Sequence, residues 1–175
     1  MSAPKQHLVL VGLMGAGKTT VGRVCAQRLD RDFVDTDDVV TRLAGMSVPE
    51  LFATGGEARF RALERDAVAD VCASPAPLVI GCGGGTVADA GNRRALSAAG
   101  FVVWLRAPVE VLAGRVGDGD DRPLLRGDPR GALTRLAAMR DAAYDAVADV
   151  EVDTEGRGVD DVATAVLDAF CAVSS

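Results

Sequence analysis

Short apolar runs alternate along the chain with longer segments whose apolar residues repeat at helical spacing. The runs are rich in Val, Leu and Ile, which is typical of strands, and they lie at 7–12, 33–35, 78–80, 101–105 and 150–152. Strands that are apolar almost throughout are buried on both faces. The alternation with helices therefore predicts an α/β fold with a parallel sheet covered by helices on both sides.

Helical periodicity is present in most segments between these runs. Residues 47–50, Ser-Val-Pro-Glu, are typical of a capping box with proline in the first turn. They predict a short helix that ends at Gly55 and Gly56, followed by a second helix from 57 to about 73. Further helices are predicted over 21–29, near 92–99, from about 108, up to 144 and at the C-terminus.

The size and charge of the chain exclude several classes of protein. A length of 175 residues, with 49% hydrophobic and 25% charged residues, fits one globular domain, 1–175. A net charge of −6 disfavours nucleic acid or an anionic membrane as partner. An enzyme for small anions can still be acidic overall if its few cations converge on one pocket.

Cysteine usage and hydropathy bear on location. The four cysteines are scattered without a CxxC pair, so we expect reduced, apolar side chains rather than a zinc site. No apolar run approaches the roughly 20 residues that a membrane-spanning helix needs, and residues 1–7 lack the layout of a signal peptide. We therefore predict a cytoplasmic protein, and we expect a monomer.

Residues 12–19, Gly-Leu-Met-Gly-Ala-Gly-Lys-Thr, match the phosphate-loop motif G-x-x-x-x-G-K-[ST] in full. The motif lies between a predicted strand and a predicted helix, where backbone N–H groups can surround phosphate oxygens. Lys18 would reach the β- and γ-phosphates, and the Thr19 hydroxyl would hold Mg²⁺. The motif predicts a nucleotide site, but it does not separate kinases from switches or motors.

Asp35 and Asp37 follow the second predicted strand, where a period of two would put both carboxylates on the side of the ligand crevice. One acid could orient Mg²⁺ or its water, and the other could accept a hydrogen bond, or a proton, from the hydroxyl being phosphorylated. The alternative is a solvated, Asp-rich turn in which Asp38 caps the next helix.

Two arginines on predicted helices are candidates for binding an anion. Arg61 has Glu64 three residues on, so the pair could be a surface salt bridge, or Glu64 could orient Arg61 for a substrate anion. Arg140 lies four residues before Tyr144 on one predicted helix, and the pair could be no more than a cation–aromatic stack. The neighbours of Arg61, Arg59 and Arg65, are expected at the surface.

Two loops complete the set of candidates. Gly83, Gly84 and Gly85 follow the third predicted strand, and three glycines in a row indicate that another molecule approaches the backbone closely. Arg122 lies in a polar segment, 117–130, between helices. That segment could be a plain surface loop, or a mobile lid that brings an arginine over the γ-phosphate and excludes water.

Six motifs in this order make the chain similar to shikimate kinase over roughly residues 8–170. They are the phosphate loop at 12–19, Asp-Thr-Asp at 35–37, Phe-Arg-x-x-Glu at 60–64, Gly-Gly-Gly at 83–85, Arg-Pro-Leu-Leu at 122–125 and Arg-x-x-x-Tyr at 140–144. The resemblance implies ATP-dependent phosphorylation of the shikimate 3-hydroxyl, on the pathway to chorismate and the aromatic amino acids. It also implies the nucleoside-monophosphate-kinase-like, three-layer αβα fold, with a five-stranded parallel sheet in the order 2-3-1-4-5 and a mobile lid.

The resemblance further implies a role for each matching position. Catalysis would involve Lys18, Asp37 and Arg122, and Mg²⁺ would be bound by Thr19, with Asp35 just outside the direct ligands of the ion. The residues implied to bind ATP are Gly15, Ala16, Gly17, Lys18, Thr19, Thr20, Arg115, Arg122 and Arg157. Those implied to bind shikimate are Asp37, Arg61, Gly83, Gly84, Gly85 and Arg140, with 36–64 as the main substrate-binding region.

Two alternatives stay open at this point. Another small phosphate-loop kinase, such as a gluconate kinase, would share the loop, although Asp-Thr-Asp and the spacing of Arg61 and Arg140 disfavour it. A nucleotide-binding regulatory module without catalysis would be expected to lack Lys18, Asp37 or Arg122, and the chain has all three.

Overall fold

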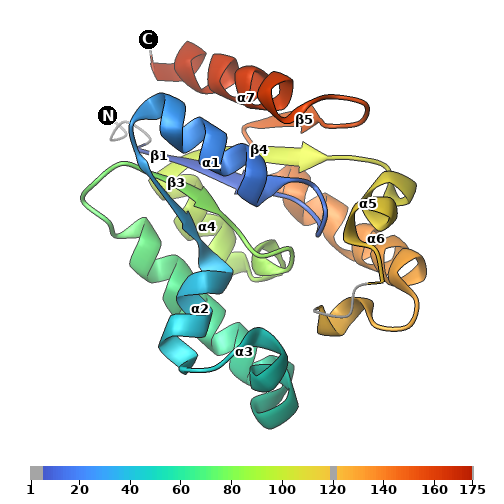
Figure 1. The fold of residues 1–175 in the computed structure, drawn as a ribbon. Coiled ribbons are helices and arrows are strands. Elements are labelled where there is room, and N and C mark those ends of the chain that lie inside the picture. The colour runs from blue at the N-terminus through green and yellow to red at the C-terminus, as the bar shows by residue number, and fades with distance from the viewer. Residues whose placement is uncertain (1–5, 119–121, 175) are drawn as a thin grey trace.

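A computed structural model describes residues 6–118 and 122–174, which form a twisted sheet between layers of helices (Figure 1). The sheet has five strands in the order β2-β3-β1-β4-β5, and every neighbouring pair is parallel. The predicted fold class, strand order and parallel pairing are therefore confirmed. The strands are β1 (His7–Val11), β2 (Asp32–Asp35), β3 (Leu78–Gly81), β4 (Gly100–Arg106) and β5 (Val150–Asp153).

Helices cover both faces of the sheet, as predicted (Figure 1). On one face α1 (Lys18–Leu29) packs against α7 (Val159–Ser174). On the other face α4 (Ala90–Ala99) contacts β4 and lies between α3 (Val48–Cys72) and α6 (Pro129–Val147). All residues of β1 and β3 are buried, because each of these strands lies between two layers of helices and two neighbouring strands.

The segment between β2 and β3 leaves the sheet and returns to it as α2 (Thr36–Ala44) and α3. The predicted capping box is confirmed: Ser47 N donates to Glu50 Oε2 at 2.8 Å, and Glu50 N donates to Ser47 Oγ at 3.4 Å. The predicted break at Gly55 and Gly56 is confirmed, because α3 consists of two helices that meet at a kink. Helical residues continue on both sides of a kink at Gly56, where φ is 69°.

The remaining elements are α5 (Val109–Val116) and two 3₁₀ turns, η1 (Thr86–Ala88) and η2 (Pro123–Leu125). The predicted lid, 117–130, is not polar throughout, because Leu125 is fully buried in η2, which packs against α6. Its last two residues already belong to α6. Residues 119–121 of the predicted lid lie outside the described residues, and the mobility of the lid stays a prediction.

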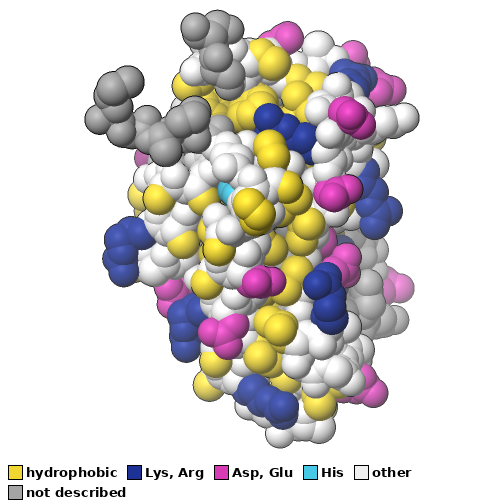
Figure 2. All heavy atoms as spheres, turned by 90° about the vertical axis from the view of Figure 1, so that its left-hand side faces the viewer, with side chains coloured by type: hydrophobic (Ala, Val, Ile, Leu, Met, Phe, Trp, Pro, Cys, Tyr) yellow, Lys and Arg dark blue, Asp and Glu magenta, His cyan; other side chains and the backbone are white. Residues whose placement is uncertain are grey.

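The surface and the cysteines add two observations. On the face drawn in Figure 2, acidic and basic side chains are interspersed among apolar ones. Cys25 and Cys82 are buried, as expected of small apolar side chains, whereas Cys171 is exposed.

Within 6–118 and 122–174, no helix is both long enough and apolar enough to span a bilayer.

Candidate active site

A cleft of about 650 Å³ lies at the carboxyl ends of β1, β2 and β3. The loops that follow these strands all reach it, which is the usual place for a ligand in an open parallel sheet. The predicted site residues that line the cleft are Gly15, Ala16, Gly17, Lys18, Thr19, Thr20, Asp35, Asp37, Arg61, Gly83, Gly84, Gly85, Arg115, Arg122 and Arg157. Arg140 adjoins the cleft at Gly84, where an added Cβ would lie 3.6 Å from its Nη1.

The phosphate loop joins β1 to α1 through a backbone that needs glycine. Gly17 precedes the first residue of α1 with φ 94° and ψ 15°, a left-handed conformation that side chains disfavour. Because glycine has no side chain to cap the helix, the first N–H groups of α1 remain for an anion to bind. The local backbone therefore fits phosphate, as the motif predicts.

Lys18 lies at the start of α1, and its Nζ donates to the carbonyl oxygens of Gly12 at 2.7 Å and Leu13 at 2.9 Å. An ammonium group has three donors, so one remains for a phosphate oxygen. Burial lowers the pKa of Lys18 to about 8, although the charges of Asp37 and Asp35 oppose this effect. The charge of Arg122 lowers the pKa of Lys18 further, so the two cations lie near one another.

Asp35 ends β2 and caps α2, so the prediction that Asp38 is the cap is wrong. Asp35 Oδ1 accepts from the backbone N–H of Asp37 at 2.9 Å, and its Oδ2 accepts from Thr19 Oγ1 at 3.1 Å. Asp38 is exposed in the first turn of α2. The predicted strand geometry for Asp35 and Asp37 is also wrong, because Asp37 already belongs to the helix. Both acids reach the cleft because the chain turns into α2 there.

Asp37 presents a carboxylate oxygen that the described residues leave unsatisfied. Its Oδ1 is buried without a hydrogen-bond partner. Burial raises the pKa of Asp37 to about 6, and the negative charges of Asp35 and Glu64 add to this effect. A carboxylate with such a pKa is mostly ionised at neutral pH and can accept a hydrogen bond or a proton.

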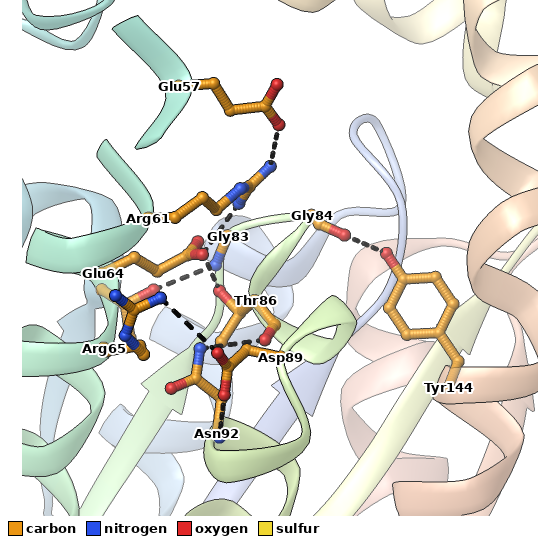
Figure 3. Close-up of polar contacts among 11 residues, drawn as sticks. Glu57, Arg61, Glu64, Arg65, Gly83, Gly84, Thr86, Asp89, Asn92 and Tyr144 are labelled. Carbon is orange, nitrogen blue, oxygen red and sulfur yellow. Dashed lines mark hydrogen bonds and ion pairs between the residues drawn. The ribbon is translucent and has the colours of Figure 1, made fainter. Parts of the chain in front are cut away.

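Arg61 and Glu64 on α3 form a partly buried ion pair rather than a simple surface salt bridge (Figure 3). Arg61 Nη1 donates to Glu64 Oε1 at 2.8 Å, and the Glu64 side chain is only 1% exposed. A second, exposed partner is Glu57, whose Oε1 accepts from Arg61 Nη2 at 3.3 Å. Opposing effects act on the guanidinium: burial lowers the pKa of Arg61, but Glu64 and Glu57 raise it by more. Arg59 and Arg65 are exposed, as predicted.

The three glycines after β3 leave room for side chains of the site itself. A Cβ added at Gly83 would lie 2.6 Å from Asp37 Oδ1, and one at Gly85 would overlap the guanidinium of Arg61. Side chains at these positions would therefore displace both groups. This gives a second reason for glycine, besides the predicted approach of another molecule.

Arg140 and Tyr144 approach Gly84 from α6. The Tyr144 hydroxyl donates to the carbonyl oxygen of Gly84 (Figure 3). The ring of Tyr144 stacks on Trp104 with centroids 5.4 Å apart. Burial lowers the pKa of Arg140, and its Nη1 is buried without a hydrogen-bond partner. The two residues therefore have separate roles, because Tyr144 holds the glycine loop and Arg140 keeps a donor available.

The far end of the cleft is built from the loop between β5 and α7. Arg115 donates to Gly15 O at 3.2 Å and to Thr154 Oγ1 at 3.0 Å. Arg157 donates to backbone oxygens of Asp153 and Asp161, both at 3.1 Å. Thr154 was not predicted, because its contact with Arg115 joins segments 39 residues apart and leaves no local pattern.

Sequence reasoning also missed the apolar wall of the cleft, formed by Val48, Phe52 and Phe60. The rings of Phe52 and Phe60 lie 4.9 Å apart, on either side of the kink at Gly56. Their apolar spacing was visible in the sequence. It could not be distinguished from the spacing of core residues.

The oxygen atoms next to the phosphate loop suit a magnesium ion. Thr19 offers a hydroxyl oxygen, and Asp35 holds that hydroxyl through its own carboxylate. Mg²⁺ prefers hard oxygen ligands and keeps several waters in nucleotide sites. The residues present therefore fit the predicted ion, which Thr19 would bind directly while Asp35 would hold the Thr19 hydroxyl from behind.

Comparison with known proteins identifies the family of the chain. Residues 14–171 match the family model of shikimate kinase. The chain belongs to the shikimate kinase family. A shikimate kinase of Symbiobacterium thermophilum is 47% identical over 165 residues, which cover 93% of this chain and 94% of the relative. One of Mesorhizobium japonicum is 42% identical over 95% of this chain and 81% of its own length.

Solved structures give the same result. The shikimate kinase from Acinetobacter baumannii in complex with shikimate superposes with a TM-score of 0.92 at 37% identity, covering 95% of this chain and 93% of that one. A gluconokinase from Sinorhizobium meliloti has a TM-score of 0.67 at 18% identity, covering 97% and 94%. The second likeness shows a shared fold alone, whereas the first agrees with the family assignment.

Proposed function

We propose that the chain transfers the γ-phosphate of ATP to the 3-hydroxyl of shikimate, on the pathway to chorismate and the aromatic amino acids. One observation carries the choice of substrate. Within the described residues, two buried side-chain polar atoms lack a hydrogen-bond partner, Asp37 Oδ1 and Arg140 Nη1. One is an acceptor and the other a donor, and both adjoin the glycine loop 83–85. Shikimate would satisfy both, because it carries hydroxyls and a carboxylate.

The carboxylate of shikimate would bind between Arg61 and Arg140. The charge of Arg61 contributes, after burial, to lowering the pKa of Arg140, so two cations share this end of the cleft. Planar guanidinium groups bind a carboxylate through paired hydrogen bonds, which suits an acid held in a fixed orientation. Gly83, Gly84 and Gly85 would allow the ring to approach the backbone.

Asp37 would accept the hydrogen of the reacting hydroxyl. Its Oδ1 has no partner among the described residues, and Lys18 is near enough for its charge to offset part of the rise in the pKa of Asp37. An ionised carboxylate here would align the hydroxyl and could take its proton as phosphoryl transfer proceeds. The role of Asp37 would thus be orientation together with proton acceptance.

The opposite side of the cleft would hold ATP. The loop residues Gly15, Ala16, Gly17, Lys18, Thr19 and Thr20 would bind the phosphates, with Arg122 as a further cation. Arg115 and Arg157 would lie towards the adenine. Mg²⁺ bound by Thr19, with Asp35 behind it, would neutralise phosphate charge.

We also propose a lid over 117–130 and a cytoplasmic, monomeric enzyme, as the sequence predicts.

A coupled assay of ADP release, run with shikimate and gluconate side by side, tests the proposal. We expect turnover that depends on shikimate and none that depends on gluconate. Lys18→Ala serves as the control, because it should abolish turnover with either compound. Wild-type turnover with gluconate alone would favour the other small kinase. ATP binding without turnover of either compound would favour the regulatory module.

A further inference from the structure

The two carboxylates that contact Arg61 differ in how firmly they can hold it. Glu57 is 59% exposed and lies 3.3 Å from Nη2, whereas Glu64 is 1% exposed and lies 2.8 Å from Nη1. An exposed ion pair is weak because water and salt screen it. A short, buried, charge-assisted hydrogen bond is stronger and more directional. The orientation of Arg61 is therefore set by Glu64.

Glu64 in turn depends on a hydroxyl from the loop after the glycines. Thr86 Oγ1 donates to Glu64 Oε2 at 2.9 Å, and Thr86 is fully buried (Figure 3). An ionised carboxylate can only accept, so the Thr86 hydroxyl must be the donor. Since a buried carboxylate is costly unless its oxygens are hydrogen-bonded, loss of this donor would leave Oε2 free to move towards another partner.

The backbone of Thr86 is itself held at two points. Its N–H donates to Gly83 O at 3.1 Å, and its own carbonyl oxygen accepts from Asn92 Nδ2 at 3.0 Å. Asn92 is buried at the start of α4, where Asp89 Oδ1 accepts from its N–H at 3.0 Å. A hydroxyl anchored by its backbone in this way has little freedom to follow Glu64. It can therefore define where the carboxylate lies.

The same loop also fixes the opposite wall of the site. Gly83 N donates to Thr36 Oγ1 at 3.0 Å, and Thr36 directly precedes Asp37. A Cβ on Gly83 would lie 3.2 Å from Glu64 Oε2 as well as against Asp37. The loop 83–86 thus sets the relative positions of the hydroxyl-binding acid and the carboxylate-binding arginine.

We propose that Thr86 is a positioning residue for substrate recognition. Its hydroxyl holds Glu64, and Glu64 holds the guanidinium of Arg61 in the orientation that binds the substrate carboxylate. Thr86 does not line the cleft, so it acts only through Glu64. This inference rests on the proposed function, because it assigns Arg61 to the carboxylate of shikimate.

Thr86→Val removes the hydroxyl at nearly constant volume and is the first test. We expect the KM for shikimate to rise about tenfold, as for loss of a hydrogen bond to a charged group, while the KM for ATP changes less than twofold. Thr86→Ser should restore the wild-type value. Thr134→Val is the matched control, because the Thr134 hydroxyl is exposed and donates only to Arg130 O, in its own helix. It should behave like the wild type.

A double-mutant cycle separates positioning from a general structural role. In an Arg61→Ala background, Thr86→Val should raise the KM for shikimate by less than twofold further, because the group that it positions is absent. If Thr86→Val does not fold, as judged by thermal unfolding, Thr86→Cys takes its place, since a thiol is a poor donor of similar size.

Three results would overturn the inference while leaving the proposed function intact. They are a wild-type KM for shikimate in Thr86→Val, equal losses for ATP and shikimate, and an undiminished effect in the Arg61→Ala background. Absence of shikimate turnover by the wild-type chain would instead overturn the proposed function, and this inference with it.

Discussion

Asp37 occupies a position that favours chemistry over stability. Its Oδ1 is buried without a hydrogen-bond partner among the described residues. Burial raises the pKa of Asp37 most, and the nearby negative charges of Asp35 and Glu64 raise it further. Because the pKa of Asp37 is higher in the folded chain than its ordinary value of 3.8, its ionisation opposes folding as pH rises from 3.8 to about 6. Above about pH 6 the folded chain bears the full free-energy cost of keeping Asp37 ionised.

Asp37→Asn should therefore make the chain more stable and less active at pH 7.5. We expect a gain of about 1–3 kcal/mol in the free energy of unfolding, since the buried charge is removed, and a smaller gain at pH 5. Turnover should fall about 10²–10⁴-fold, as for loss of a general base. Urea unfolding and the coupled assay measure the two effects. Exposed Asp38→Asn is the control, and a less stable or fully active Asp37→Asn would contradict the assignment.

The pH dependence of kcat/KM should report Asp37 and Lys18 in the free enzyme. Asp37 must be ionised, which fails as pH falls below its pKa of about 6. Lys18 must be charged, which fails as pH rises above its pKa of about 8. We expect a bell-shaped profile between pH 5 and 9, measured with the coupled assay. The residual activity of Asp37→Asn should lack the acid limb. A flat wild-type profile would contradict both assignments.

Arg61 and Arg140 should serve the acid substrate rather than the nucleotide. We expect Arg61→Ala and Arg140→Ala each to weaken shikimate binding by at least tenfold, as for loss of a charged hydrogen-bond partner, while ATP binding changes little. Calorimetric titration with each ligand measures this. Arg59→Ala, at an exposed position on the same helix, is the matched control. An equal loss of affinity for shikimate and for ATP would contradict the placement of these arginines at the shikimate carboxylate.

At the scale of elements, the glycine loop after β3 is ordered by contacts from three helices. Thr36 of α2 accepts from Gly83 N, Glu64 of α3 accepts from Thr86, and Tyr144 of α6 donates to Gly84 O. Three consecutive glycines lose much conformational freedom on folding, and these contacts offset that cost. The site therefore depends in part on side chains that do not line the cleft, namely Thr36 and Tyr144.

Tyr144→Phe tests this dependence, because it removes one hydrogen bond and leaves the stacking on Trp104 possible. The carbonyl of Gly84 would lose its buried partner, so we expect a loss of about 1–3 kcal/mol in stability. The KM for shikimate should rise severalfold more than the KM for ATP, because Arg140 adjoins the same glycine. Thermal unfolding and kinetics measure both. Unchanged kinetics despite reduced stability would limit Tyr144 to a structural role.

The elements also show where sequence reasoning succeeds and where it fails. The strands and the capping box at Ser47 are encoded locally, by apolar runs and by a pair three residues apart. The start of α2 is not encoded locally, because Asp35, Asp37 and Asp38 are all residue types that can cap a helix. Asp35 is the cap in a structure where Thr19 also donates to it, and that contact joins residues 16 apart. Thr86 and Thr154 were missed for the same reason.

At the scale of the whole molecule, an acidic chain brings several of its cations together at one cleft. The net charge is −6, and on the face in Figure 2 the two signs are interspersed. The cleft collects six cations from distant segments, namely Lys18, Arg61, Arg115, Arg122, Arg157 and the adjoining Arg140. This agrees with the expectation that an acidic kinase can bind two anionic substrates through local convergence of charge.

The central claim is that this cleft joins the γ-phosphate of ATP to a hydroxyl of shikimate. Phosphorus NMR of the purified chain with ATP, Mg²⁺ and shikimate tests it most directly. The account predicts one new phosphomonoester signal, from shikimate 3-phosphate, for each ADP formed, and no such signal with the Lys18→Ala variant. Formation of ADP and inorganic phosphate without a shikimate phosphate would contradict it.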